Sequence, residues 1–426
     1  MKVLLLGSGG REHALAWSLR HSPRVQRLYA LPGSDAIATL AEPVAGDPCD
    51  PAQVVEAAER LQPDLTVVGP EAPLAAGVSD ALRARGYAIF GPSQAAARLE
   101  SSKIYAKEFM QRHGIATARA VACDSAAEAL RALAEFGAPV VIKADGLAAG
   151  KGVVVAEDQA EAERAAAAMF AGQLGAAGRR VLVEERLRGE EVSVLALSDG
   201  ERFELLPPAQ DHKRARNGDT GPNTGGMGAY SIDELLTAEQ RAAVAEQVVR
   251  PVLEGMRAEG EPFQGVLYCG LMLTAAGPRV LEFNARFGDP ETQALLLRAE
   301  GDLAAALAAA AGGQLAAGTL RWTAEAGACV VLASAGYPGE YPKGLPIHGL
   351  EQAAREPGVV LFHAGTALRQ QQWVTNGGRV LGIAARGSSL ALALERCYAA
   401  AEEIRFEGKH YRSDIGRARV ATASRL

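Results

Sequence analysis

Short apolar strands and helices alternate through the N-terminal part of the chain, and this alternation restricts the fold more than any other feature. Residues 3–6 are predicted to form a buried strand, the turn Gly7-Ser8-Gly9-Gly10 follows, and a helix is expected over 11–20. Further strands are predicted at 27–31, 65–68 and 88–90, with helices at 51–61 and 78–85. Such alternation with short connections predicts a parallel, doubly wound α/β sheet, which is a Rossmann-like N-terminal domain.

The glycine turn after the first strand indicates an anion site. Small residues let backbone N–H groups approach a phosphate at a helix N-terminus. The fingerprint G-x-G-x-x-G is incomplete because Glu12 stands at its third glycine position, and no acid closes the second strand at 31–33. A nicotinamide dehydrogenase is therefore disfavoured. A smaller phosphorylated ligand is favoured, with glycines that serve only the turn as the alternative.

Length and composition exclude several classes of protein. The 426 residues suggest roughly three domains, and we predict boundaries at 1–102, 103–325 and 326–426. The net charge of −6 argues against a nucleic-acid partner. The apolar start ends at Gly7, and no stretch approaches the roughly 18 apolar residues of a membrane span. Five cysteines without C-x-x-C spacing fit a reducing cytoplasm, where we expect the protein.

A glycine-rich flap is predicted in the middle of the chain, within a small lid subdomain over 117–187. An apolar strand ends at Lys143, the loop 144–152 contains Lys151, and a return strand follows at 153–155. The Walker spacing fails and no helix follows, so this is a hairpin whose lysines and glycine amides can close over phosphates. The strand 181–185 ends in two acids that can accept from ribose or adenine, although most such pairs are surface charge.

Two further segments carry polar residues. Ser101 or Ser102 is expected to cap a helix that presents Lys103 and Lys107 on one face, although each lysine alone is more often a surface residue. The stretch 219–228 is rich in Gly, Thr, Asn and Asp, and is predicted to be a long irregular binding loop. His212 before it is a candidate general base, with a simple hydrogen-bonding role as the alternative.

The stretch 280–292 suggests a metal and phosphate site. Glu282 and Asn284 are two residues apart, so on a strand they share one face, while Phe283 points into a core. Carboxylate and amide oxygens suit Mg²⁺ bridged to phosphates. Arg286 continues this face and can pair with a phosphate or a carboxylate. A polar, solvated strand end is the alternative.

Taken in order, these segments resemble the ATP-grasp ligases, and among them the family that joins glycine to phosphoribosylamine. The resemblance runs along nearly the whole chain. It rests on GSGGREHALAW at 7–17, VGPEAPL at 68–74, FGPS at 90–93, VIKADGLAAGKGV at 141–153, QDHKR at 210–214, DTGPNTGGMGAYS at 219–231, EFNARFGDPETQ at 282–293, HAGT at 363–366 and TNGGRVLG at 375–382.

The resemblance implies an ATP-grasp fold in the middle of the chain, a small α/β C-terminal domain and residue roles. For ATP it implies Lys103, Lys143, Gly146, Gly150, Lys151 and Gly152 at the phosphates, Glu184, Glu185 and Leu187 at adenine, and Glu191 at ribose. For glycine and 5-phosphoribosylamine it implies Gly9, Gly10, Glu71, Asp211, Lys213, Asp219, Asn223, Thr224, Gly225, Gly226, Arg286, Gly288 and Asp289. Lys143, Arg286 and Asp289 would be catalytic, and Glu282 and Asn284 would bind Mg²⁺ or Mn²⁺.

The sequence departs from the family pattern in two places. Gly270 stands where many ATP-grasp enzymes have an acid on the preceding strand, which implies a metal site poorer in protein ligands. The loop 32–36 reads Pro-Gly-Ser-Asp-Ala in place of the usual P-G-N-A-G. The expected enzyme is a monomeric carbon–nitrogen ligase that forms ADP. The alternatives are a biotin-dependent carboxylase subunit, another carboxylate–amine ligase, or a non-catalytic nucleotide-binding module.

Overall fold

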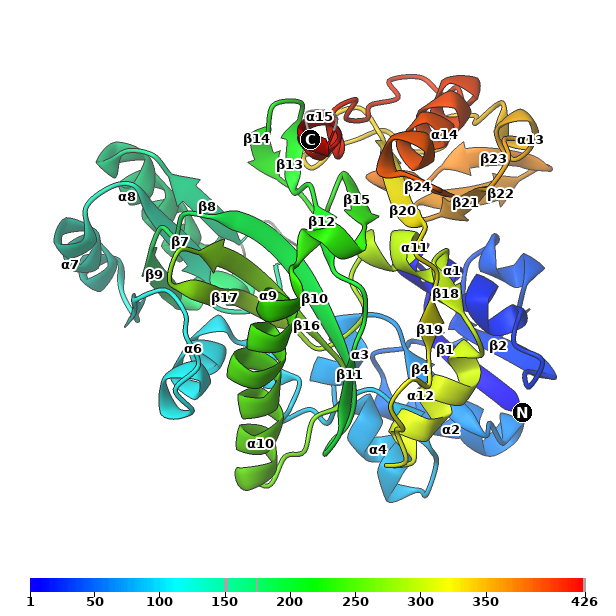
Figure 1. Ribbon diagram of the computed structural model, residues 1–426, viewed down its shortest axis with the longest axis horizontal. Coiled ribbons are helices and arrows are strands. Elements are labelled where there is room, and N and C mark those ends of the chain that lie inside the picture. Colours follow the sequence, from blue (N-terminus) through cyan, green and yellow to red (C-terminus); the bar gives the residue numbers. More distant parts are fainter. Residues whose placement is uncertain (149–151, 174, 424–426) are drawn as a thin grey trace.

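The computed structural model describes residues 1–148, 152–173 and 175–423, in which the chain forms an N-terminal unit, a lid, a central sheet and a C-terminal unit. In Figure 1 the lid lies at the left, the N-terminal unit at the lower right and the C-terminal unit at the upper right. Within this described part of the chain, no helix is long and apolar enough to cross a membrane.

The N-terminal unit is built on a parallel sheet with strand order β3-β2-β1-β4-β5. This confirms the predicted doubly wound α/β unit. Its first strand is almost wholly buried, as the apolar run predicts. The elements are β1 (Lys2–Gly7), α1 (Gly10–Arg20), β2 (Arg27–Pro32), β3 (Glu42–Pro43), α2 (Pro51–Leu61), β4 (Leu65–Val68), α3 (Glu71–Ala75), α4 (Val78–Ala84), β5 (Ile89–Phe90) and α5 (Arg98–Ser101). The helix α6 (Lys103–Arg112) follows this unit. Ser102 caps α6, since its hydroxyl accepts from the amide of Tyr105.

The lid is an antiparallel sheet of order β6-β9-β7-β8 that packs against two helices and has a hydrophobic core of its own. Its elements are β6 (Ala120–Cys123), α7 (Ala126–Phe136), β7 (Val140–Ala144), β8 (Val153–Ala156), α8 (Gln159–Ala168) and β9 (Val181–Glu185). The pairing of β7 with β8 confirms the predicted hairpin at the base of the glycine-rich loop. Because the lid has a hydrophobic core of its own, it forms a subdomain distinct from the central sheet.

The central sheet continues into the C-terminal unit, with strand order β17-β16-β10-β12-β15-β20-β24-β21. The junction is the antiparallel pair β15–β20. The middle elements are β10 (Glu190–Asp199), β11 (Phe203–Leu205), β12 (Ala209–Asp211), β13 (Arg214–Arg216), β14 (Thr220–Asn223), β15 (Gly228–Ser231), α9 (Ala238–Val244), α10 (Arg250–Ala258), β16 (Gln264–Thr274), β17 (Gly277–Asn284), α11 (Glu291–Leu296), β18 (Ala299–Glu300), α12 (Leu303–Ala311) and β19 (Arg321–Trp322). The C-terminal elements are β20 (Ala326–Ala333), α13 (Leu350–Ala353), β21 (Val359–His363), β22 (Thr366–Arg369), β23 (Gln372–Thr375), β24 (Arg379–Gly387), α14 (Leu390–Glu403) and α15 (Arg417–Ala423).

A register shift in the β16–β17 hairpin sets which side chains face the lid. Gly270 pairs with Glu282, but the next residue of β16 pairs with Val280, so Leu281 is an extra residue in β17. Val280 and Phe283 are buried, as expected for Phe283, while Glu282 and Asn284 face the opposite side. Gly270 leaves room for that acid, because a Cβ there would lie 3.3 Å from the Glu282 Cγ.

The stretch 219–228 is more ordered than the sequence predicts. Instead of one long irregular loop, it contains β14, which pairs with β13, and the start of β15. The turn of this hairpin uses Gly218 and Asp219, whose φ values are +69° and +56°. The prediction failed because the strands have little apolar alternation. Contacts with the C-terminal segment hold them instead, and Figure 1 shows α15 beside this hairpin.

The N-terminal and C-terminal units meet at two neutral histidines. The amide of His363, at the end of β21, donates to Nδ1 of His13 on α1 at 2.8 Å, and the rings lie 5.6 Å apart. Burial lowers the pKa of His13 to about 3, with a further contribution from His363, whose own pKa is lowered to about 4 by burial. The Nδ1 atom must stay unprotonated to accept this hydrogen bond, so the contact depends on neutral rings.

We predict that the free energy of unfolding decreases as the pH falls from about 6.5 to 4. In this range the unfolded chain protonates its histidines near their ordinary pKa of about 6.5, while His13 stays neutral in the folded state. His13 alone should contribute roughly 3 kcal/mol of this loss. Denaturant titrations across this range should show a shallower pH dependence for His13→Asn, which keeps an acceptor in place. The matched control is the exposed His21→Asn, and an unchanged slope in His13→Asn would contradict the assignment.

Candidate active site

A cleft of about 1800 Å³ lies between the lid, the central sheet and the two terminal units. It collects most of the residues that the sequence singles out. Those that line it are Glu71, Lys103, Lys143, Gly146, Gly152, Glu184, Glu185, Leu187, Glu191, Asp211, Lys213, Asp219, Asn223, Thr224, Gly225, Glu282, Asn284, Arg286 and Asp289. One continuous cleft therefore joins the predicted ATP, metal and substrate residues.

A buried chain of charges runs along the lid side of this cleft. Glu184 on β9 forms ion pairs with Lys143 at 2.8 Å and with Lys107 at 3.0 Å. Burial alone would raise the pKa of Glu184, but the two lysines lower it. Lys107 is only 4% exposed, in contrast to the expected surface residue. The Glu184 carboxylate is thus committed to the lysines, and its side chain is not available to accept from adenine.

The ammonium group of Lys143 is aimed at the cleft by two acceptors. In addition to Glu184, its Nζ donates to the carbonyl of Leu281 at 2.8 Å. Leu281 is the extra residue of the β17 bulge, so the irregularity that turns Glu282 toward the cleft also supplies this acceptor. Two acceptors, one of them a carboxylate, hold the ammonium group in place. A phosphate of a bound nucleotide could take the place of one of these acceptors.

One of the predicted metal residues, Glu282, lies beside a half-buried lysine. Lys213 Nζ is 2.7 Å from Glu191 Oε1 and 3.3 Å from Glu282 Oε1. Burial opposes ionisation of both groups, yet the pKa of Lys213 is raised by Glu191 and Glu282, while Lys213, Lys103 and Lys143 lower the pKa of Glu282 to about 2. Glu282 is therefore a carboxylate at neutral pH.

The oxygen atoms of Glu282 and Asn284 suit a divalent cation that takes its remaining ligands from water and substrate phosphates. Over residues 1–148, 152–173 and 175–423, no group of three His, Cys, Asp or Glu side chains could hold a metal. Glu282 and Asn284, which line the cleft, stay the predicted metal-binding pair. Mg²⁺ suits such a site, because it usually keeps several waters and binds one or two carboxylates plus substrate phosphates.

Arg286 is held by two acids of the N-terminal unit. Its guanidinium lies 2.8 Å from Glu100 Oε1 and 3.3 Å from Glu71 Oε2. Glu100 Oε2 also accepts from the amide of Ala285 at 2.7 Å. Although burial would raise the pKa of Glu71, Arg286 and Arg11 lower it to about 2, whereas burial raises the pKa of Glu100. The arginine therefore keeps one orientation toward the cleft.

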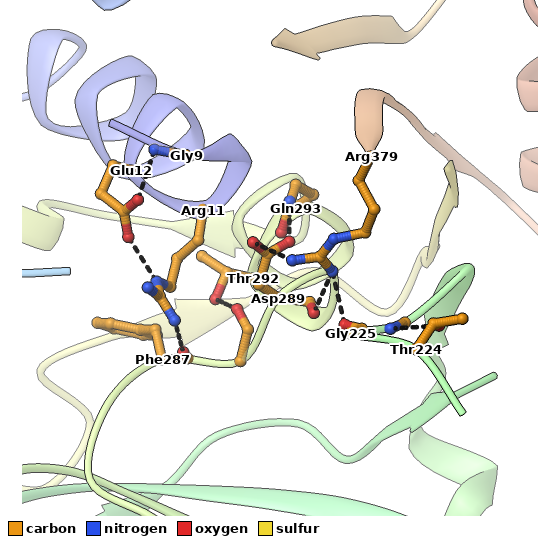
Figure 2. A network of polar contacts seen from close by, with 12 residues as sticks. Gly9, Arg11, Glu12, Thr224, Gly225, Phe287, Asp289, Thr292, Gln293 and Arg379 are labelled. Carbon is orange, nitrogen blue, oxygen red and sulfur yellow. Dashed lines mark hydrogen bonds and ion pairs between the residues drawn. The ribbon is translucent and has the colours of Figure 1, made fainter. Parts of the chain in front are cut away.

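Asp289 is the centre of a second polar network, shown in Figure 2. Its carboxylate is 2.9 Å from Arg379 Nη2 and accepts from Gln293 Nε2 at 2.8 Å. Burial would raise the pKa of Asp289, but Arg379 and Arg11 lower it. Arg11 of α1 pairs with Glu12 and donates to the carbonyl of Phe287, so this network links α1, the segment before α11 and β24.

Two acids that line the cleft each have a buried carboxylate oxygen. Glu291 accepts from the hydroxyl of Tyr268 at 2.8 Å and from Ser193 at 3.3 Å. Asp211 has its Oδ1 buried without a hydrogen-bond partner among the described residues. Burial and the charge of Glu291 raise the pKa of Asp211 well above its usual value. A substrate N–H group would supply the partner that this oxygen lacks.

The C-terminal segment holds the β13–β14 hairpin from outside. Arg412, which is 2% exposed, donates to the carbonyl of Arg214 and to Asp219 Oδ1, each at 3.0 Å. At the other end of the hairpin, Asn223 Nδ2 donates to the carbonyl of Val153 on β8 at 3.2 Å. The predicted substrate residues Asp219 and Asn223 therefore also tie the hairpin to the C-terminal unit and to the lid.

Some predicted residues have other places. Gly9, Gly10, Gly226 and Gly288 do not line the cleft within the described structure. The Gly9 amide, expected to meet a phosphate, donates to Glu12 Oε2 at 2.7 Å, so Glu12 already supplies the anion there. Gly226 and Gly288 bond to Thr224 and Thr292, which shape their loops. Gly150 and Lys151 lie outside the described residues, and their roles stay predictions.

Sequence reasoning missed several residues of the site. Arg11, Glu291 and Arg379 lie within the motifs that carry the family resemblance, so the motifs contained a signal that single-residue chemistry did not reveal. Glu100, in contrast, has no local signal: it precedes Ser101-Ser102 and is distant in sequence from Arg286. Only the fold brings the two together.

Comparison with known proteins agrees with this geometry. The family model for the ATP-grasp (A) domain of phosphoribosylglycinamide synthetase matches residues 101–292. Models for the N domain and the C domain of the same family match residues 1–100 and 327–418. The chain belongs to the phosphoribosylglycinamide synthetase family. Membership confirms the resemblance drawn from the motifs, and with it the ATP-grasp fold of the middle part.

Relatives of this synthetase family match along the full chain. A phosphoribosylamine–glycine ligase of Mesorhizobium japonicum is 49% identical over 421 residues, which is 99% of each chain. That of Pseudomonas aeruginosa is 49% identical over 426 residues, again 99% of each chain. The crystal structure of the Thermotoga maritima phosphoribosylamine–glycine ligase has a TM-score of 0.84 at 34% identity, covering 97% of this chain and 100% of that one. The biotin carboxylase domain of the Hydrogenobacter thermophilus 2-oxoglutarate carboxylase shares the fold, with a TM-score of 0.74 at 17% identity, covering 96% of this chain and 91% of that one.

We predict that Glu100→Gln lowers kcat/KM by about 10- to 100-fold, the equivalent of roughly 1–3 kcal/mol for a weakened hydrogen bond to a charged group. Glutamine still offers an oxygen to the Ala285 amide, but it removes the charge that holds Arg286. Steady-state kinetics and thermal melting should be measured together. Glu108→Gln, an exposed acid on α6, is the control. A loss of stability with unchanged kcat/KM would show that Glu100 serves only the fold.

Proposed function

We propose that the protein catalyses the ATP-dependent ligation of glycine to 5-phosphoribosylamine, giving glycinamide ribonucleotide, ADP and phosphate in purine biosynthesis. Family membership over all three parts of the chain supports this activity. The observation that carries it is the convergence of Lys143, Glu282, Asn284, Arg286 and Asp289 on one cleft. Its basic residues supply positive charge for phosphoryl transfer to a carboxylate, and its acidic residues can bind an amine.

The chemistry requires activation of the glycine carboxylate, whose charge is delocalised and whose oxygen is a poor leaving group. Attack of this carboxylate on the terminal phosphorus of ATP forms glycyl phosphate and releases ADP. The amine then attacks the acyl carbon, and phosphate leaves with one former glycine oxygen. Lys143 and Arg286 offset the repulsion between the carboxylate and the triphosphate, in a cleft that limits water.

A divalent cation would be held by Glu282 and Asn284, with Mg²⁺ proposed and Mn²⁺ as a substitute. When bound, it would supply positive charge to the phosphates during transfer. Glu282 is ready for this role because its pKa of about 2 keeps it ionised. Asn284 Oδ1 accepts from Arg286 at 3.3 Å, so the same arginine orients the amide oxygen. Lys213 balances the charge of Glu282 until the cation arrives.

The proposed mechanism needs no protein nucleophile, and His212 does not serve as a general base. Its Nε2 accepts from the amide of Gly416 at 3.3 Å, and burial, with Arg412 nearby, lowers its pKa to about 4. It acts as a neutral hydrogen-bonding residue that ties β12 to the C-terminal segment. Catalysis then rests on positioning and on charge stabilisation.

We also propose domain boundaries at 1–102, 103–325 and 326–426, and a chain that acts as a monomer. The net charge of −6 disfavours nucleic acid as a partner. The free state of all five cysteines supports a reducing, cytoplasmic location.

Oxygen transfer from glycine to phosphate tests the reaction path. Glycine labelled with ¹⁸O in its carboxylate should yield one labelled oxygen in inorganic phosphate for each amide formed, because that oxygen bridges carbon and phosphorus in glycyl phosphate. Mass spectrometry of the phosphate measures it, with unlabelled glycine in ¹⁸O-water as the control for hydrolysis. AMP as the nucleotide product, or unlabelled phosphate, would overturn the proposed path.

The metal assignment predicts that Glu282→Gln weakens binding of Mn²⁺ in the presence of ADP. Changing a residue that only supports a ligand typically costs about 10–100-fold in metal affinity, so loss of a direct ligand should cost at least about tenfold. A titration in which free Mn²⁺ is followed by electron paramagnetic resonance measures this affinity without turnover. The exposed Glu254→Gln on α10 is the control. Equal affinities in both variants would mean that Glu282 is not a ligand.

A further inference from the structure

Arg379 reaches from the C-terminal unit into the substrate half of the cleft. It is the first residue of β24, and its side chain is 21% exposed. Nη1 donates to the carbonyls of Gly225 and Asp289, at 2.6 and 2.8 Å, while Nη2 is 2.9 Å from Asp289 Oδ2. Figure 2 shows the guanidinium between these two segments. One side chain therefore connects two loops that are far apart in sequence.

The acceptors of Arg379 belong to both predicted substrate segments. Gly225 has its carbonyl bound by Arg379, and its amide donates to the hydroxyl of Tyr337 at 3.1 Å. Both polar groups of this residue are thus held by the C-terminal unit. The neighbouring Thr224 donates to the carbonyl of Lys213 at 2.9 Å. This contact links the Gly225 segment to the lysine that lies beside Glu282.

The carboxylate of Asp289 is held at both oxygens. Arg379 approaches Oδ2, and Gln293 Nε2 donates to Oδ1 at 2.8 Å. Each carboxylate oxygen can accept more than one hydrogen bond, so Asp289 can still receive an N–H group of a substrate. Its direction is set before the substrate arrives. Such preorganisation removes the entropic cost of ordering the acid during binding.

We propose that Arg379 is a positioning residue for the acid and amine substrates. It holds Asp289 and the Gly225 peptide in the geometry that receives glycine and phosphoribosylamine, and among the described residues its side chain forms no hydrogen bond or ion pair with those assigned to ATP. The C-terminal unit thereby sets recognition of these substrates and leaves nucleotide affinity to the lid. This inference rests on the proposed function, in which Asp289 contacts a substrate.

The contact geometry calls for arginine specifically. Three acceptors lie around one planar group, and a guanidinium offers donors in a fixed fork that meets several acceptors at once. A lysine can keep the charge opposite Asp289, but its single nitrogen cannot reproduce the same three contacts. The conservative variant should therefore rescue only part of the function.

The first test compares Arg379→Gln and Arg379→Lys with Arg386→Gln. Arg386 lies on the same strand and forms an exposed pair with Glu325, so it controls for changes to β24. In R379Q we expect kcat/KM for glycine or phosphoribosylamine to fall about 10- to 100-fold, as for lost hydrogen bonds to charged groups, with KM for ATP within about twofold. R379K should be intermediate and R386Q unchanged. An equal loss for all three substrates would overturn the proposal, and R379K decides this if R379Q does not fold.

A double-mutant cycle with Asp289→Asn separates the positioning role of Arg379 from the substrate contact of Asp289. If Arg379 acts through Asp289, the loss in the double variant R379Q/D289N should be at least about fivefold smaller than the product of the single losses. Losses that multiply would overturn the positioning role. An unchanged kcat/KM in D289N alone would instead refute the substrate contact of Asp289 in the proposed function. Thermal melting of each variant confirms that folded protein is compared.

Discussion

The bulge at Leu281 is the constraint on which the cleft depends. In a regular strand, Val280 would share a face with Glu282 and Asn284. The extra residue instead lets Val280 and Phe283 enter the core, while Glu282 and Asn284 face the cleft. The bulged residue is also an acceptor for Lys143. One local irregularity of the backbone thus aligns the acid, the amide and the lysine that the sequence predicts at the phosphate site.

Around this strand, three of the charged groups that face the cleft have a counter-charge from another part of the fold. Arg286 is held by acids of the N-terminal unit, and Asp289 is held by an arginine of the C-terminal unit. Lys143 of the lid shares Glu184 with Lys107 of α6. Because an isolated buried charge is costly, these pairs keep the site ionised and aligned before any ligand binds.

The parts of the fold with regular apolar periodicity could be predicted from the sequence. The strands of the N-terminal unit, the β7–β8 hairpin and the shared face of Glu282 and Asn284 all follow from local patterns. The β13–β14 hairpin, the burial of Lys107 and the role of Glu100 could not be predicted in this way. Each depends on ion pairs or hydrogen bonds between residues far apart in sequence, which leave no periodic signal.

The hydrogen bond from Asn223 to the carbonyl of Val153 has a mechanical consequence. It joins the strand that carries the glycine-rich flap to the hairpin that leads to Thr224 and Gly225. A displacement of β8 would therefore act directly on the segment that contains Thr224 and Gly225, which the C-terminal unit holds from its other side.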